Sequence, residues 1–202
     1  MTDTPQPEIA PEDRQRADLY NFMGLTLSAP PDELLLAQVA SLSGDETPLG
    51  EAIDTLAKMA RITKPKTVES EFNALFIGLG RGELLPYASY YMTGFLNEKP
   101  LALLRQDMTA RGLARSETVF EPEDNIASLM EMMAAMIVGR FGSPADLATQ
   151  RGFYQKHIAP WAGHFFDDLE GAKNSVFYAP VGRVGHLFME VETEAFRLER
   201  AS

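Results

Sequence analysis

Apolar residues recur along most of the chain at three- and four-residue spacing, the pattern of amphipathic helices. The first such stretch predicts a helix over about 13–28, with an apolar face made of Leu19, Phe22, Met23, Thr26 and Leu27. Capping residues, prolines and glycines mark where the others begin and end. Asp32, Thr47 before Pro48, and Ser143 before Pro144 mark three of the starts. The further ranges are about 33–42, 48–60, 67–76, 98–110, 122–141, 144–158, 160–170 and 181–199.

Two features complete this picture of the fold. The stretch from Gly78 to Asn97 is rich in glycine and tyrosine and predicts an ordered loop. Alternation of β-branched and polar residues extends nowhere beyond four residues, so no strand is expected. The chain is therefore predicted to be all-α, with eight or nine helices. We expect one domain over 13–202, after a disordered acidic and proline-rich leader over 1–12; any internal boundary would lie between about 112 and 121.

Composition narrows the possible functions. The 202 residues carry 18 Lys and Arg against 29 Asp and Glu, a formal net charge of -11. Such a surface repels phosphate backbones, so nucleic-acid binding is not expected. A helical DNA-binding regulator is accordingly a poor candidate. A basic peptide is the simplest partner for this charge.

The absence of cysteine excludes disulfides, thiolate metal sites and cysteine nucleophiles. No apolar run approaches the roughly 20 residues of a membrane-spanning helix, and the first residues lack the features of a secretory signal. We therefore expect a cytoplasmic protein without stable membrane insertion.

Two patterns could carry enzyme chemistry. The Gly78–Gly82 segment resembles a phosphate loop, but it follows no strand and matches no phosphate-loop spacing, which favours a turn. His157 and His164 lie seven residues apart, with Asp167 and Asp168 nearby, so a helical metalloenzyme remains an alternative. Pro160 interrupts the shared helix, however, and no nucleophile motif is present. We expect no enzyme, no resident metal and no cofactor.

The predicted 122–141 helix is rich in methionine, with Met130, Met132, Met133 and Met136. Buried helices use methionine to fill the core. A deformable groove for apolar partners is the alternative use of such a cluster.

The most informative segment is acidic. Four acids lie between Glu117 and Asp124, with no basic residue among them. Pro122 suits the first position of the following helix, and Glu123 and Asp124 would then stabilise its first turn. So dense a patch beside an apolar helix also suits a basic, partly apolar peptide, because each guanidinium seeks a carboxylate.

Several separated motifs together resemble the TorD/DmsD-like redox-enzyme maturation chaperones, which are related to the NarJ-type nitrate reductase assembly proteins. The resemblance covers about 15–198. Its pieces are a "Y-x-x-L-F" helix at Glu71–Gly78, a "P-Y-x-S-x-Y" loop at Pro86–Tyr91, an E-P-x-D-H hinge motif at Glu121–Asn125, a His-to-Trp stretch at His157–Trp161, and a terminal helix with Leu187, Phe188 and Glu190. Asn125 replaces the histidine of the hinge motif, and an amide neither titrates nor becomes cationic near neutral pH.

The resemblance implies an all-helical cytoplasmic chaperone without catalysis. Such proteins bind the twin-arginine signal peptide, and sometimes the apo form, of a molybdenum-cofactor oxidoreductase until its cofactor is inserted. Clients of the formate dehydrogenase type and of the S- or N-oxide reductase type, such as trimethylamine N-oxide or dimethyl sulfoxide reductase, all fit. Family members are linked to weak guanine-nucleotide binding and to domain-swapped dimers, so the chain is expected to be a monomer or such a dimer.

The expected peptide-binding residues are Glu121, Pro122, Glu123, Asp124, Asn125, Leu75, Phe76, Tyr87, Ser89 and Tyr90. We expect Glu121, Glu123 and Asp124 to receive the paired arginines. Leu75, Phe76, the two tyrosines and methionines of the following helix would hold the apolar part of the signal peptide. An assembly adaptor that binds a folded redox subunit, without recognising a signal peptide, is the main alternative.

Overall fold

The computed structural model describes residues 9–113 and 121–199, and these residues form an all-helical domain. Within those ranges no β-strand occurs, and one isolated bridge joins Tyr87 to Asn125. The α-helices are α1 (Pro11–Ser28), α2 (Glu33–Ala40), α3 (Pro48–Ile62), α4 (Pro65–Phe72), α5 (Ala88–Thr93), α6 (Lys99–Ala110), α7 (Ile126–Val138), α8 (Leu147–Phe153), α9 (Ala162–Gly171) and α10 (Tyr178–Glu199). Two π-helical turns, η1 (Asn73–Ile77) and η2 (Tyr154–Ile158), extend α4 and α8.

The all-α fold is confirmed, but the helix count is higher than expected. The described residues contain ten α-helices, and the one that was not predicted is α5, which lies inside the stretch predicted to be a loop. It is only six residues long, and its start is stabilised by Asp124, 35 residues away in the sequence. A helix that depends on such a distant residue leaves no periodic signal of its own.

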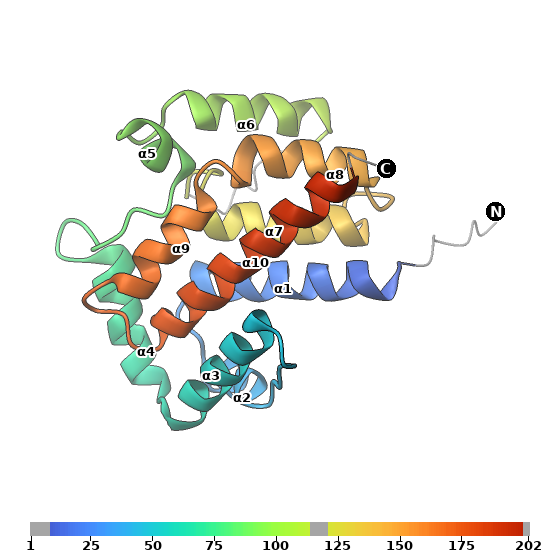
Figure 1. Ribbon diagram of the computed structural model, residues 1–202. Helices are drawn as coiled ribbons and strands as arrows, with labels where there is room; N and C mark the ends of the chain where they lie inside the picture. Colours follow the sequence, from blue (N-terminus) through green and yellow to red (C-terminus); the bar gives the residue numbers. More distant parts are fainter. Residues whose placement is uncertain (1–8, 114–120, 200–202) are drawn as a thin grey trace, which may run out of the picture.

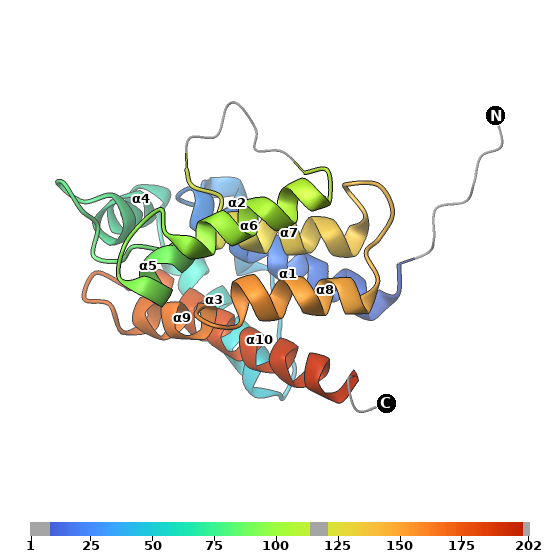
Figure 2. The ribbon, with the colours of Figure 1, turned by 90° about the horizontal axis from the view of Figure 1, so that it is seen from above.

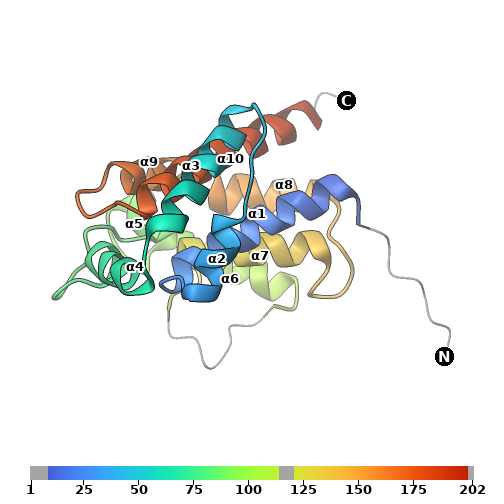
Figure 3. The same cartoon turned by 90° about the horizontal axis from the view of Figure 1, so that it is seen from below.

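The long helices α1, α7 and α10 run through the middle of the molecule (Figure 1). Helix α1 packs along α7, and α10 packs against α9 and α3. Seen from above, α6 crosses over this centre (Figure 2), whereas α2 and α3 cover the opposite side, which the view from below presents (Figure 3). The α5–α6 side and the α2–α3 side are therefore separate surfaces.

The core explains the methionine cluster of α7. Met130 and Met133 are fully buried and Met136 is nearly so, within one apolar cluster that also contains Trp161. Core packing is thus the role of these side chains. A deformable methionine groove would require α7 to leave its position.

Helix boundaries follow the capping residues, with some differences. Asp32 and Thr47 accept backbone N–H bonds at the starts of α2 and α3, as predicted. Asp146, and not Ser143, caps α8. Helix α1 begins at Pro11, two residues before the predicted start; residues 1–8 and most of the possible 112–121 boundary lie outside the described residues.

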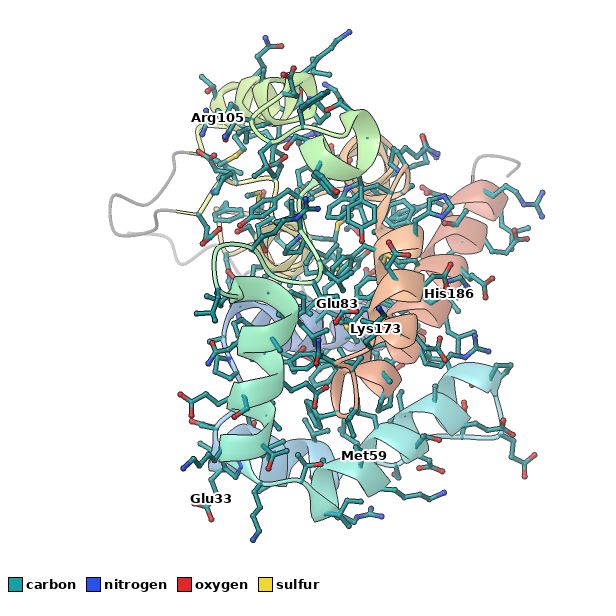
Figure 4. The ribbon with its side chains drawn as sticks, turned by 90° about the vertical axis from the view of Figure 1, so that its left-hand side faces the viewer. Glu33, Met59, Glu83, Arg105, Lys173 and His186 are labelled. Carbon is teal, nitrogen blue, oxygen red and sulfur yellow. The ribbon has the colours of Figure 1, made fainter. Side chains whose placement is uncertain are left out.

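Two buried carboxylates join distant parts of the fold. Glu71 on α4 accepts the backbone N–H groups of Val176, Phe177 and Tyr178, so it satisfies the start of α10. Glu192 on α10 accepts two hydrogen bonds of 2.8 Å from the Arg16 guanidinium of α1. Beside the first contact, Glu83 accepts the N–H of Lys173 at 2.7 Å (Figure 4).

Candidate functional site

The acidic segment, Glu121–Asn125, lies against the chain that leads into α5. The Ala88 N–H donates to the Asp124 carbonyl at 3.0 Å, and the Ile126 N–H donates to the Pro86 carbonyl at 2.9 Å. These bonds bring together two motifs that are far apart in the sequence: Ser89 and Asp124, for example, are separated by 35 positions. The loop motif and the acidic motif therefore lie in contact with each other and form one candidate site.

The acidic segment precedes helix α7 and is not its first turn. The prediction that Pro122 begins the helix is wrong: Asn125 is the N-cap, and its side-chain oxygen accepts the Ala127 N–H at 2.9 Å. Pairing with Tyr87 keeps Asn125 extended, which prevents the helix from beginning earlier. The acids consequently lie outside the α7 helix and can serve other partners.

Asp124 is almost completely buried. One carboxylate oxygen accepts the Ser89 N–H at 2.8 Å, at the start of α5. The other oxygen, and the Ser89 hydroxyl, are buried without a hydrogen-bond partner. Asp124 therefore positions α5, and neither residue reaches the surface in this conformation.

Glu123 is paired with a cation from its own chain. Its Oε2 accepts bonds from Nε and a terminal nitrogen of Arg105, at 3.1 and 2.8 Å. The bond from Glu123 raises the pKa of Arg105. The sequence pattern does not reveal Arg105, because this residue lies on α6, 18 residues before Glu123 in the chain.

Glu121 is the exposed acid of the segment. The hydroxyl of Tyr87 donates a hydrogen bond to it. Burial raises the pKa of this phenol, and the neighbouring Glu121 raises it further, so the hydroxyl stays protonated. The pair presents a carboxylate beside an aromatic ring at the surface.

The remaining predicted residues divide between two places. Tyr90 follows on α5, where the Arg81 guanidinium lies 5.2 Å from its ring centroid and donates to its hydroxyl at 2.6 Å. Leu75 is fully buried, and Phe76 packs edge-on against Phe72 and Tyr178, in an aromatic cluster of α4, η1 and α10. Pro122 is partly buried between the acids.

The glycine segment is a turn. Gly78 has a φ of 62°, and a Cβ there would overlap the carbonyl oxygen of Arg81. Glycine avoids that overlap and the strain of positive φ. The backbone geometry thus accounts for this glycine as a turn residue.

In the metalloenzyme alternative, His157, Asp167 and Asp168 each contact a different residue, and His164 is exposed. His157 Nε2 lies 2.7 Å from Asp107, which also binds Lys156 at 2.8 Å. Asp168 accepts a bond from Tyr91, and Asp167 lies beside His186. In the part of the chain that the structure describes, no group of three or more His, Asp or Glu side chains could hold a metal ion.

The helices also bear on membrane association. None of those in residues 9–113 and 121–199 is long and apolar enough to cross a bilayer.

Comparisons with known proteins agree with this architecture. A family model described as the nitrate reductase delta subunit matches residues 43–167, more than half of the chain. The chaperone protein TorD of Aliivibrio fischeri is 25% identical, over 93% of this chain and 97% of its own length. The TorD of Vibrio cholerae strain O395 is 28% identical over 77% of this chain and 73% of its own.

A solved structure from Archaeoglobus fulgidus, described as a redox enzyme maturation protein, has the same fold. It superposes with a TM-score of 0.56 at 20% identity, over 94% of this chain and 98% of that chain. The chain belongs to the nitrate reductase delta subunit family, that is, to the NarJ/TorD family of redox-enzyme maturation chaperones.

Proposed function

We propose that this chaperone binds the twin-arginine signal peptide of a molybdenum-cofactor oxidoreductase in the cytoplasm and holds the apo-enzyme until its cofactor is inserted. The observation that carries the proposal is the Arg105–Glu123 contact, because it demonstrates that the acidic segment accommodates a guanidinium. A signal peptide with two arginines offers the same chemistry from outside.

The three acids would contribute differently. Glu121 is exposed and beside Tyr87, so it would contact an incoming arginine directly. Glu123 would exchange its internal partner Arg105 for a guanidinium of the peptide. Asp124 is buried, so it would not contact the peptide; it would attract the arginines electrostatically and hold α5 in place.

The test is a calorimetric titration with a panel of signal peptides from formate dehydrogenase, trimethylamine N-oxide reductase and dimethyl sulfoxide reductase. Each peptide has an Arg-Arg to Lys-Lys control, because lysine keeps the charge but loses the planar fork. We expect a Kd of about 1 μM or tighter for at least one peptide. The lysine control should bind more weakly.

Variants of single acidic residues test which of them bind the peptide. Glu121→Gln should weaken binding and flatten its dependence on salt, whereas Glu69→Gln, an exposed acid on α4, should leave both unchanged. Equal affinities of the Glu121 variant and the wild type would remove Glu121 from the site.

The adaptor alternative draws on one observation: Leu75, Ser89 and Asp124 are buried, which leaves little of the predicted site open to a peptide. A client subunit with and without its signal peptide separates the two functions. Retained binding after the deletion favours the adaptor, and lost binding favours signal-peptide recognition.

A further inference from the structure

The turn between α3 and α4 gathers positive charge. Four cations, Lys58, Arg61, Lys64 and Lys66, lie within nine residues, whereas the whole chain has 18 cations in 202 residues. Residues 55–68 contain no aspartate or glutamate. All four cationic side chains are exposed, and we call these four residues the basic turn. On a chain with a net charge of -11, the basic turn is a local reversal of sign.

The basic turn lies at the end of the molecule opposite the acidic segment. Figure 4 places Met59, which lies within the basic turn, toward the lower end, and Arg105, the partner of Glu123, at the upper end. Glu33 of α2 is also at the lower end. None of the four cations, however, forms an ion pair with it or with any other carboxylate of the described residues. Their charge is therefore available to a partner.

The fold does not explain why the lysines of the basic turn are cationic. Lys64 is the N-cap of α4 and Lys66 lies in its first turn, where the positive end of the helix dipole disfavours a cation. No acid in the first turn of α4 offsets them. Arg61 does have a local partner, because it donates to the Ala40 carbonyl at 3.0 Å. The two lysines of α4 are placed against the stability of their own helix, which points to a role outside the fold.

An apolar side chain projects from the middle of these charges. Ile62, the last residue of α3, is 76% exposed. Only Thr63 and Lys64 separate α3 from α4, so the turn is tight, and Pro65 after it is exposed as well. An exposed apolar residue among lysines and arginine is typical of a surface that rests on anionic lipid, because the cations meet the headgroups while the apolar side chain enters the interface.

We propose that the basic turn binds the surface of membranes that contain anionic phospholipid, an activity beyond the proposed function. The net charge of the chain does not prevent this contact, because interactions between exposed charges are screened beyond about 8 Å at physiological salt. The acids at the far end of the molecule therefore contribute little. An acidic protein would need a socket shaped for Ile62, whereas a fluid headgroup layer adapts to it. With the basic turn on the membrane, the acidic segment at the opposite end stays uncovered.

The test is sedimentation of the full chain with vesicles of phosphatidylcholine, either alone or mixed with phosphatidylglycerol. We expect the wild type to sediment only with the mixed, anionic vesicles and to be released by added salt. Lys64→Gln and Lys66→Gln should each weaken binding about fivefold, which is the usual contribution of one lysine at an anionic surface. Ile62→Gln should weaken it about tenfold, because the apolar contact with the interface is lost.

Two controls separate binding from folding. Lys99→Gln is the matched variant, because Lys99 is also an exposed lysine at the start of a helix, α6, but lies outside the basic turn; it should bind vesicles like the wild type. Chemical denaturation should find the Lys64 and Lys66 variants at least as stable as the wild type, since each removes a cation from the positive end of α4. Weaker vesicle binding without a loss of stability is then an effect on the surface.

Four results would overturn the proposal. The wild type could fail to sediment with anionic vesicles, or it could bind neutral vesicles equally well, which would remove the role of charge. Binding that is unchanged when Lys58, Lys64 and Lys66 are all replaced by Gln would assign the membrane contact to another face. Retention on immobilised polyglutamate without vesicle binding would identify an acidic protein as the partner. These assays contain no signal peptide, so their failure and the failure of the proposed function are separate results.

Discussion

The guanidinium of Arg105 lies 2.8 Å from the carboxylate of Glu123, so the acidic segment holds an arginine of its own chain. Glu123 is almost buried, whereas about half of the Arg105 side chain is exposed. An incoming guanidinium must therefore compete with one that is already in place, and Arg105 acts as an internal competitor.

Replacing this competitor should strengthen peptide binding. We expect Arg105→Gln to raise the affinity for a twin-arginine peptide by about threefold to tenfold, because one fewer guanidinium competes for Glu123. Glu123→Gln should lower the affinity. Calorimetry on both variants checks this, with Arg197→Gln as a control, since Arg197 pairs with Glu194 on α10. An Arg105 variant that binds more weakly than wild type would contradict the competition.

The buried acid should have a structural role that can be separated from binding. Asp124→Ala removes the acceptor for the Ser89 N–H, and we expect a loss of about 1–3 kcal/mol in unfolding free energy. Asp124→Asn keeps an oxygen acceptor and should lose less. Chemical denaturation of both variants measures the difference. Equal losses would show that the charge, and not the hydrogen bond to α5, carries the stability.

A second stability prediction concerns the interior ion pair of α1 and α10. Burial opposes the charged form of Arg16, but Glu192 outweighs it and raises the Arg16 pKa. Glu192 also accepts the Tyr20 hydroxyl at 2.9 Å. Glu192→Gln should cost about 3 kcal/mol, because it removes the buried counter-charge of a largely buried guanidinium and leaves the partly exposed Asp13 to pair with it.

The matched control for this variant is Glu194→Gln, two residues along the same helix. Glu194 is exposed, and within the described part of the chain its ion-pair partner is the exposed Arg197. Its replacement should leave the melting temperature nearly unchanged. Similar melting temperatures for the two variants would remove the buried ion pair as a source of stability.

Stability should also depend on pH through His157. Burial lowers the pKa of this imidazole below its ordinary value of 6.5, although Asp107 opposes the change. The unfolded chain therefore binds more protons between pH 6.5 and the lower folded pKa, so stability falls as the pH decreases through that window.

Melting temperatures measured between pH 7.5 and 5.5 test this dependence. His157→Gln should reduce the slope of melting temperature against pH, whereas replacement of the exposed His164 by Gln should leave the slope as in the wild type. A slope that is unchanged in the His157 variant would assign the pH dependence to other groups.

Much of this protein could be predicted from local pattern. The apolar spacing gave the long helices, and the short-range caps at Asp32 and Thr47 placed their starts, because a cap and its N–H lie within three residues of each other. The order of the motifs also pointed to the NarJ/TorD family, which the family match confirms. The roles of the ten predicted binding residues remain predictions.

What tertiary structure decided depends on contacts across long stretches of chain. The start of α5 depends on Asp124, and the start of α10 depends on Glu71. Glu123 pairs with Arg105 of α6, 18 residues earlier in the chain. A hollow of about 700 Å³ likewise forms only where α1, α2 and α3 meet. Periodicity reports which side of each helix is apolar. The packing of the helices follows from the need to bury all of their apolar faces in one core, and that packing decides which polar groups meet. It is therefore a property of the whole chain.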